Sequence, residues 1–188
     1  MRYSLSHKQE TRERLLESSA ASAKKSGFAP IGVDGLMKAI GLSGGAFYGH
    51  FSSKDELFGA IVERELSRSV ARLGGEGSAD PAQLERCLKL YLSMSHVEQV
   101  ESGCVLPALG AEIARADMAV RERAEAWLCR LQQCWAQVLG SEGQAWSILS
   151  QCVGALVVAR MMSTPELQHQ VLQSSRDEID RQIGRPSG

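Results

Sequence analysis

One short segment of the chain concentrates side chains that can hold the phosphate groups of a nucleic acid. Tyr48 and His50 offer a hydroxyl and an imidazole, and Lys54 follows two serines that can cap a helix. An ammonium group beside the exposed N–H groups of a helix start is well suited to bind phosphate. Lys8 and Lys38, in the preceding segments, supply two further charges. We therefore expect this part of the chain to contact a phosphate backbone.

A thiol is the second chemically distinctive group. Cys104 follows Ser102-Gly103 and opens a predicted helix, where the positive end of the helix dipole favours a reactive thiolate. The residue is therefore a candidate for modification by oxidants or electrophiles, although a small cysteine also enters a core readily. The remaining cysteines show no zinc-binding spacing, and we expect all of them to be reduced: Cys87, Cys129, Cys134 and Cys152.

The phosphate-binding candidates lie on a predicted pair of short helices. Four apolar residues follow the i, i+3, i+4, i+7 spacing of one helix face: Val33, Leu36, Met37 and Ile40. Gly41 then ends the first helix, and Ser43 can cap the second, whose Phe47 and Phe51 face the core. This pattern predicts a helix-turn-helix, in which the second helix enters a major groove. An ordinary core-forming helical hairpin is the alternative.

The second helix of this pair carries mostly small residues. The positions that we expect to meet DNA there are Ser43, Gly44, Gly45, Ala46 and Tyr48. Few of these side chains can donate to a base. We hypothesise that the helix reads DNA through close backbone approach, through the Ala46 methyl against thymine, and through DNA shape.

The ordered signature GLSGGAFYGHFSSKDELF resembles the DNA-binding domain of the TetR family of one-component transcriptional regulators. With the helix that precedes it, the resemblance extends from His7 to Phe58. It implies an all-α homodimer that binds a pseudo-palindromic operator and is released by a small-molecule inducer, with repression the commoner mode. Ser102-Gly103-Cys104 also resembles the start of the sixth helix in family members that sense electrophiles or oxidants.

Charge is distributed unevenly along the 188 residues. Residues 1–54 carry eight Lys and Arg against four Asp and Glu, net +4, whereas residues 55–188 carry 13 against 18, net −5. The positive part is the part with the motif, as nucleic-acid binding requires. We predict a helix-turn-helix DNA-binding domain at 1–54 and a larger helical effector-binding and dimerisation domain at 55–188, with about nine helices in all.

Residues 146–162 form a predicted helix that is apolar on every side, so it must be covered on every side. One side can face the core and the other a second copy of the chain, in a four-helix bundle that the family resemblance also implies. A central helix of the monomer is the alternative. The residues that we expect at a homodimer interface are Gly154, Ala155, Val158, Leu172 and Ile179.

A pocket for the inducer should lie in the larger domain, where a predicted helix starts at Asp80-Pro81 and ends around Val100. Aromatic and sulfur-containing side chains can line such a pocket, and the scarce polar groups His96 and Arg160 can orient a ligand. Plain core packing is the alternative for each. The candidate lining residues are Tyr91, Met94, Cys104, Trp127, Leu131, Trp146 and Arg160.

Signatures of catalysis are absent from the sequence. It contains no phosphate-binding G-x-x-x-x-G-K-[ST], no H-E-x-x-H, no nucleophile elbow and no dinucleotide fingerprint. We therefore predict a protein that is not an enzyme and needs neither metal nor cofactor. No apolar run approaches about 18 residues, so we expect a cytoplasmic protein without a membrane partner. A helical dimer that acts through protein contacts alone is the remaining rival.

Overall fold

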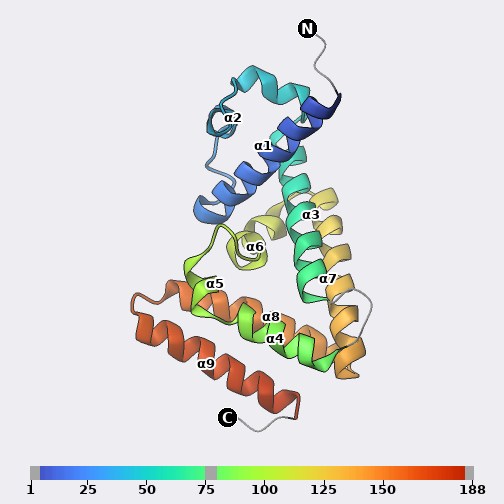
Figure 1. Ribbon diagram of the computed structural model, residues 1–188, viewed down its shortest axis with the longest axis vertical. Coiled ribbons are helices and arrows are strands. Elements are labelled where there is room, and N and C mark those ends of the chain that lie inside the picture. The colour runs from blue at the N-terminus through green and yellow to red at the C-terminus, as the bar shows by residue number, and fades with distance from the viewer. Residues whose placement is uncertain (1–4, 75–79, 185–188) are drawn as a thin grey trace.

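In the computed structural model, residues 5–74 and 80–184 are described, and every regular element within these ranges is a helix (Figure 1). The all-α prediction is therefore confirmed. The elements, in chain order, are α1 (Leu5–Ser26), α2 (Val33–Ala39), the 3₁₀ helix η1 (Gly44–Gly49), α3 (Lys54–Leu73), α4 (Pro81–Tyr91), α5 (Met94–Glu98), α6 (Leu106–Arg115), α7 (Met118–Leu139), α8 (Glu142–Met161) and α9 (Pro165–Gln182).

Local signals explain the helix-turn-helix formed by α2 and η1. Helix α2 ends at Ala39, and Gly41 follows in the left-handed region with φ of +78°, a conformation that suits a glycine after a helix end. The second helix is 3₁₀ rather than α, and three of its six residues are glycine, which weakens the preference for a longer α-helix. Ser43 occupies its N-cap, although the hydroxyl makes no capping hydrogen bond.

Helix α3 begins with a reciprocal cap. The Ser53 hydroxyl accepts from the Glu56 N–H at 3.0 Å, and the Glu56 carboxylate accepts from the N–H and the hydroxyl of Ser52 at 2.7 and 2.6 Å. Such a box fixes where a helix starts. The cap thereby places Lys54 in the first turn of α3, directly after η1.

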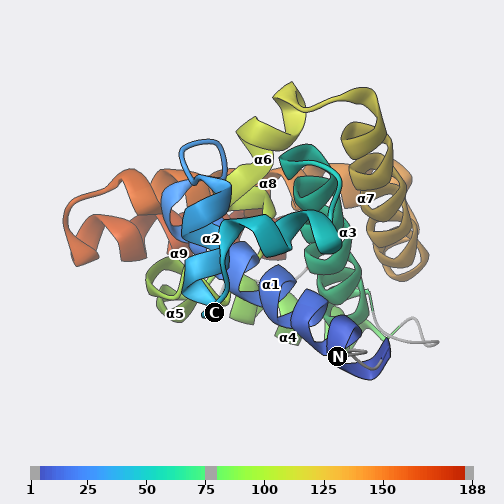
Figure 2. The same cartoon turned by 90° about the horizontal axis from the view of Figure 1, so that it is seen from above.

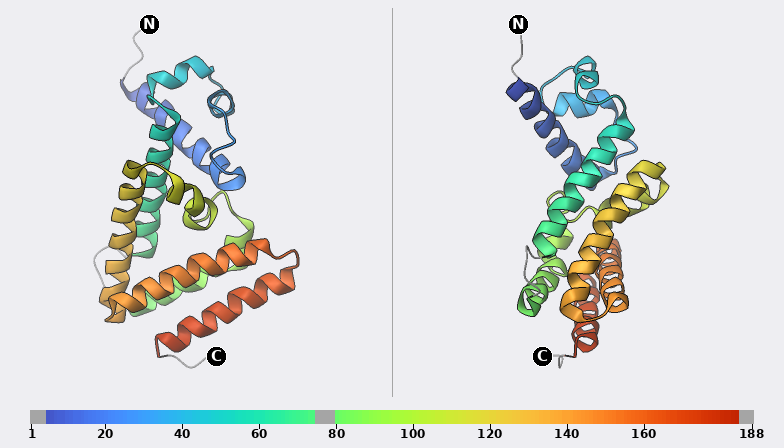
Figure 3. Two further views of the ribbon diagram at one scale, coloured as in Figure 1. Left: turned by 180° about the vertical axis from the view of Figure 1, so that it is seen from behind. Right: turned by 90° about the vertical axis from the view of Figure 1, so that its right-hand side faces the viewer.

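We call α1, α2 and η1 the head, and α4 to α9 the body; α3 connects them. Seen from above, the head covers one end of the molecule, with α8 and α9 behind it (Figure 2). Helix α3 runs beside α7, and α8 packs against α9 (Figure 3). Helix α6 lies between the head and α8 (Figure 1).

Two apolar clusters hold this arrangement together. The first joins the head and α3 with α6 and α7, around fully buried Phe47, Leu57 and Leu109. The second fills the body, around Ile148 and Leu156 of α8. Because α6 and α7 contribute to the head's own cluster, the head and the body share part of their apolar packing.

Two sequence-based expectations about the body need correction. The helix expected from Asp80-Pro81 to about Val100 starts as predicted, with Asp80 as its cap, but it is divided into α4 and α5, because the Ser93 hydroxyl donates to Leu90 O at 2.7 Å and accepts from the N–H of His96. Helix α6 begins at Leu106 after Val105 at its cap, so Cys104 precedes the helix rather than opening it.

Candidate functional site

The outward surface of η1 is open and made mainly of backbone. Space around Gly45 and Gly49 is empty, whereas a Cβ atom at Gly44 would collide with the Asp34 carboxylate of α2. Tyr48 is 69% exposed and its ring packs edge-on against buried Phe47. The backbone of η1 is therefore open to close approach by a groove of DNA. Tyr48 is the most prominent side chain on this surface of η1.

Cationic groups border this surface. The pKa of His50 lies below its ordinary value because of burial and the nearby charges of Lys8 and Arg12. The Arg12 guanidinium lies 4.6 Å from the centre of the Phe51 ring, which fixes its position. Exposed Lys38 adds a charge at the end of α2. Phosphates that approach η1 would meet several cations at once.

Lys54 is engaged within the protein. Its ammonium donates to Ala29 O at 2.7 Å and lies 4.9 Å from the centre of the Phe28 ring. The N–H groups of Phe28 and Ala29 in turn donate to the Glu112 carboxylate of α6 at 2.9 to 3.1 Å. A phosphate contact by Lys54 would replace or share the contact to Ala29 O, and α6 holds the same loop.

The residues expected at a dimer interface fall into two groups. Gly154 and Val158 lie on an exposed face of α8. Ala155, Leu172 and Ile179 are 7%, 1% and 2% exposed, because the chain's own α8–α9 packing covers them. The exposed apolar surface beside Gly154 consists of Trp146, Val157, Val158 and Met161 on α8, with Leu167 on α9.

The body contains a cavity of about 300 Å³ between α3, α4, α5 and residues 99–104. Of the residues expected to line a pocket, it brings together Tyr91 and Cys104, whereas Arg160 reaches the carbonyl of His96 with Nη2 at 2.7 Å. The others lie elsewhere, in core packing or on the α8 surface: Met94, Trp127, Leu131 and Trp146. The cavity also contains Ser69 and Arg72 of α3.

The imidazole of His96 fastens the wall of this cavity. Its Nδ1 lies 2.8 Å from Tyr91 O, and its Nε2 lies 2.9 Å from the backbone nitrogen of Cys104. A carbonyl only accepts and an amide N–H only donates, so the proton is assigned to Nδ1 and the ring is neutral. Burial is the main cause that lowers the pKa of His96. The hydrogen bond to the carbonyl of Tyr91 raises this pKa, and the charges of Arg160, Arg72 and Lys24 lower it further.

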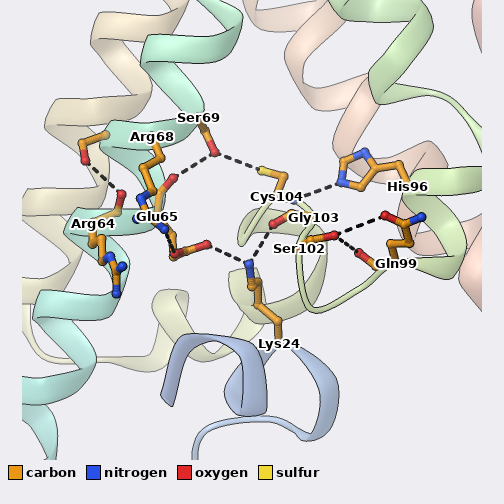
Figure 4. Close-up of polar contacts among 11 residues, drawn as sticks. Lys24, Arg64, Glu65, Arg68, Ser69, His96, Gln99, Ser102, Gly103 and Cys104 are labelled. Carbon is orange, nitrogen blue, oxygen red and sulfur yellow. Dashed lines mark hydrogen bonds and ion pairs between the residues drawn. The ribbon is translucent and has the colours of Figure 1, made fainter. Parts of the chain in front are cut away.

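The same wall is bonded to the head (Figure 4). The Lys24 ammonium of α1 donates to Gly103 O at 3.1 Å and to the Glu65 carboxylate of α3 at 2.8 Å. The side chains of Lys24 and Glu65 are only 4% and 7% exposed. A Cβ atom at Gly103 would lie 2.7 Å from the His96 ring, so this close approach requires glycine. Residues 99–104 therefore contact the cavity on one side and the head on the other.

A second cavity, of about 630 Å³, lies where the head meets the body. It is bounded by α1, α3 and residues 101–102 and includes Lys24 and Glu65. Arg72 and Ser102 border both cavities. The two cavities therefore share part of their lining, next to the contact of Lys24 with Glu65 and Gly103.

Neither a metal site nor a membrane span is found in the part of the chain that the structure describes. No three His, Cys, Asp or Glu side chains there are grouped as metal ligands, and all five cysteines are free. None of the described helices combines the length and apolar character needed to cross a bilayer.

The chain combines a helix-turn-helix head, bordered by cations, with a helical body that contains a cavity and is hydrogen-bonded to the head. This is the architecture of a helix-turn-helix transcriptional regulator. Residues 15–61 match the family described as bacterial regulatory proteins, tetR family. A search of curated proteins gave no match.

Solved structures share this architecture over nearly the whole chain. The reduced form of NemR from E. coli is 21% identical, with a TM-score of 0.78 over 94% of this chain and 100% of that one. A TetR transcriptional regulator from Chloroflexus aurantiacus is 22% identical, with a TM-score of 0.79 over 97% and 98%. A TetR transcriptional regulator from Legionella pneumophila is 19% identical, with a TM-score of 0.75 over 96% and 98%. The chain therefore has the fold of TetR transcriptional regulators.

Proposed function

We propose that this chain is a transcriptional repressor that binds a pseudo-palindromic operator as a homodimer and releases it when a small-molecule inducer enters the body. The match of residues 15–61 to the tetR family, over a helix-turn-helix with an open outer surface, is the observation that supports this most directly. In this proposal residues 1–54 contact DNA, residues 55–188 bind the effector and dimerise, and the protein acts in the cytoplasm.

DNA contact would combine two kinds of group. The backbone of Gly44 and Gly45, the Ala46 methyl and the hydroxyl of Ser43 approach base edges, and exposed Tyr48 lies beside them. Phosphates are held at the edges of this surface by the ammonium groups of Lys8, Lys38 and Lys54 and by a hydrogen bond from the imidazole of His50. Because base donors are few, we expect much of the selectivity to come from DNA shape.

A second copy of the chain would cover the exposed apolar surface of α8. Trp146, Val158 and Met161 are 39%, 44% and 72% exposed there, and Gly154 lets another helix approach closely. A twofold dimer presents two heads, which must be separated by about 34 Å to read successive major grooves on one side of DNA.

Release would follow from the position of residues 99–104. They form one wall of the effector cavity, and Gly103 O binds Lys24 of the head. A ligand that displaces this wall changes how α1 is held, and so changes the separation of the two heads.

Modification of Cys104 by an oxidant or electrophile is an alternative route of release. The residue is only 6% exposed, but it lines the cavity, and the Ser69 hydroxyl lies 3.9 Å from its Sγ. A product larger than the thiol would press on the same wall. Alkylation with N-ethylmaleimide should then release DNA from the unmodified sequence and leave a Cys104→Ser variant bound.

The experiment that tests the proposal is fluorescence anisotropy of labelled DNA from immediately upstream of the gene, titrated with reduced protein at several salt concentrations. Binding should weaken steeply with salt. Lys54→Ala should weaken it, whereas Lys89→Ala, on α4 of the body, serves as a matched control. Failure to bind any fragment at low salt would favour a dimer that acts through protein contacts.

A further inference from the structure

The Asp34 carboxylate is a negative charge on the surface that the proposed function assigns to DNA. Asp34 is exposed in the first turn of α2, and α2 packs against η1. Lys38 lies one turn further along α2, where Cβ atoms are about 5–6 Å apart. The carboxylate nevertheless has no hydrogen-bond or ion-pair partner among the residues that the structure describes. It is therefore available to a group from outside the chain.

The position of this carboxylate depends on Gly44 of η1. A Cβ atom at Gly44 would overlap with Oδ1 of Asp34 and would lie 3.0 Å from its Cγ. The carboxylate therefore occupies the space that a side chain at position 44 would take. Because position 44 is one of those that we assign to base edges, the functional group offered there belongs to Asp34.

The chemistry of a carboxylate selects among the four bases. An ionised carboxylate only accepts hydrogen bonds. In the major groove the amino groups of cytosine (N4) and adenine (N6) donate, whereas guanine and thymine present acceptor oxygens. Adenine carries its N7 acceptor beside the amino group, and this acceptor repels a carboxylate. Cytosine is therefore the base that suits Asp34 best.

Electrostatic repulsion makes this selection sharper. A carboxylate that meets the acceptors of a wrong base, close to the phosphates of DNA, weakens binding to that sequence. A cytosine amino group offsets the repulsion, because it donates a hydrogen bond to a charged acceptor. The hydroxyls of Ser43 and Tyr48 can both donate and accept, so they distinguish bases less strictly. Asp34 thus adds selectivity to a surface with few side chains that can read bases.

We propose that Asp34 is a specificity-determining residue, whose carboxylate accepts from N4 of one cytosine in each half of the operator. The missing side chain at Gly44 gives the carboxylate the space to reach that base edge. This inference rests on the proposed function, because it names one base of the DNA that the chain binds.

The test uses the full-length protein and selects its binding sites from a DNA library with a randomised centre. Sites selected by the unmodified protein should contain a fixed cytosine in each half, and selection by Asp34→Asn or Asp34→Ala should lose it. Anisotropy then measures the preference. Exchange of this cytosine for thymine should weaken binding of the unmodified protein by about 5- to 100-fold, the usual cost of one wrong base pair, and binding of the two variants by less than about threefold.

A further variant separates the position of the carboxylate from its charge. Gly44→Ala keeps Asp34 but displaces its carboxylate, so it should also lose the cytosine preference. Gly35→Ala on α2 is the matched control, because its added Cβ makes only an ordinary contact of 3.9 Å with Ile31. Asp55→Asn removes an exposed charge from the first turn of α3 and should keep the preference.

Selected sites without a fixed cytosine would overturn the assignment, as would a cytosine preference that survives in Asp34→Ala and Gly44→Ala. An equal loss of affinity for all sequences in Asp34→Ala, together with a lower melting temperature, would also overturn it, because Asp34 would then act only in the packing of α2 and η1. A failure of the proposed function is distinguishable, because the unmodified protein would then bind no member of the library even at low salt.

Discussion

The two candidate sites differ in how exposed their charged groups are. At the head, exposed Lys8 and Lys38 border the open backbone surface of η1, so their charges face solvent and are screened by salt. Where the body meets the head, the charges are instead buried: the side chains of Lys24 and Glu65 are only 4% and 7% exposed. Salt therefore screens the charges of the head surface and leaves the buried pair largely unaffected.

The contact between these regions is itself a buried ion pair. Lys24, Glu65 and Gly103 connect α1, α3 and the cavity wall within 3.1 Å (Figure 4). Substitutions at this connection should therefore change both the stability of the protein and its DNA binding.

The largest effect is expected from Lys24→Met. The variant leaves the buried Glu65 carboxylate with only the longer, 3.8 Å contact to exposed Arg68, so the cost should approach the about 3–5 kcal/mol in the free energy of unfolding that a broken buried pair gives. Urea denaturation measures this loss. The double variant Lys24→Met/Glu65→Leu should recover most of the stability while DNA release remains altered; if the double variant is as unstable as the single one, the buried charge is not the cause.

Gly103→Ala should reduce stability by about 1–3 kcal/mol, because the added Cβ forces the His96 ring to shift. The disturbed wall should also change the affinity for DNA. Gly110→Ala in α6 is the control, since nothing lies within 4 Å of its added Cβ, and helix propensity makes it neutral or slightly stabilising. Equal melting temperatures for the two variants would contradict the tight His96 contact.

Lys54→Ala should change DNA binding more than stability. The loss of one phosphate contact weakens all DNA sequences alike and reduces the salt slope of binding by about 1. The slope is measured by anisotropy between low and moderate salt. A change in sequence preference at unchanged slope would assign Lys54 to base reading, or to the loop contact with Ala29 alone.

The smallest effect is a pH dependence of stability. The pKa of His96 lies below its ordinary value, since burial disfavours the imidazolium and Arg160, Arg72 and Lys24 repel it. Below about pH 6.5 the unfolded chain therefore binds more protons than the folded chain, and the free energy of unfolding falls as the pH falls through this window.

Because His96 is partly exposed, the slope should be a fraction of the about 1.4 kcal/mol per pH unit that one fully shifted proton gives. Denaturation curves between pH 5 and 7 measure this slope. The interval lies within the range of about pH 5–8 in which proteins are usually most stable. The curves are best compared in a His50→Gln background, because the pKa of His50 is also lowered. His96→Gln should flatten the remaining slope; an unchanged slope would place its origin elsewhere.

The helix-turn-helix of the head and the start of α3 were predictable because their signals are local. The apolar spacing of α2, the turn at Gly41 and the cap at Ser53 each act within a few residues, and the structure confirms the two helices that they predict. The 3₁₀ form of η1 was not predicted, since Ser43 suggested an ordinary α-helical cap.

The cavity was less predictable because distant segments form it. Ser69 and Arg72 belong to α3 and meet α4 and α5 only after the chain folds back, and no periodicity in the sequence marks that meeting. Leu131, one of the candidate lining residues, instead fills the core, which is the commoner use of large apolar side chains. The unexpected break at Ser93 is what brings His96 to the cavity.

In the proposed mechanism, DNA binding at the head and the cavity wall in the body are coupled through residues 99–104. Amide hydrogen exchange of the full-length protein, with and without upstream DNA, tests this without any knowledge of the inducer, because coupling is reciprocal. The account predicts that bound DNA slows exchange at the Cys104 N–H, which donates to His96, and at the neighbouring Gly103. Slower exchange confined to the head, with residues 99–104 unchanged, would contradict it.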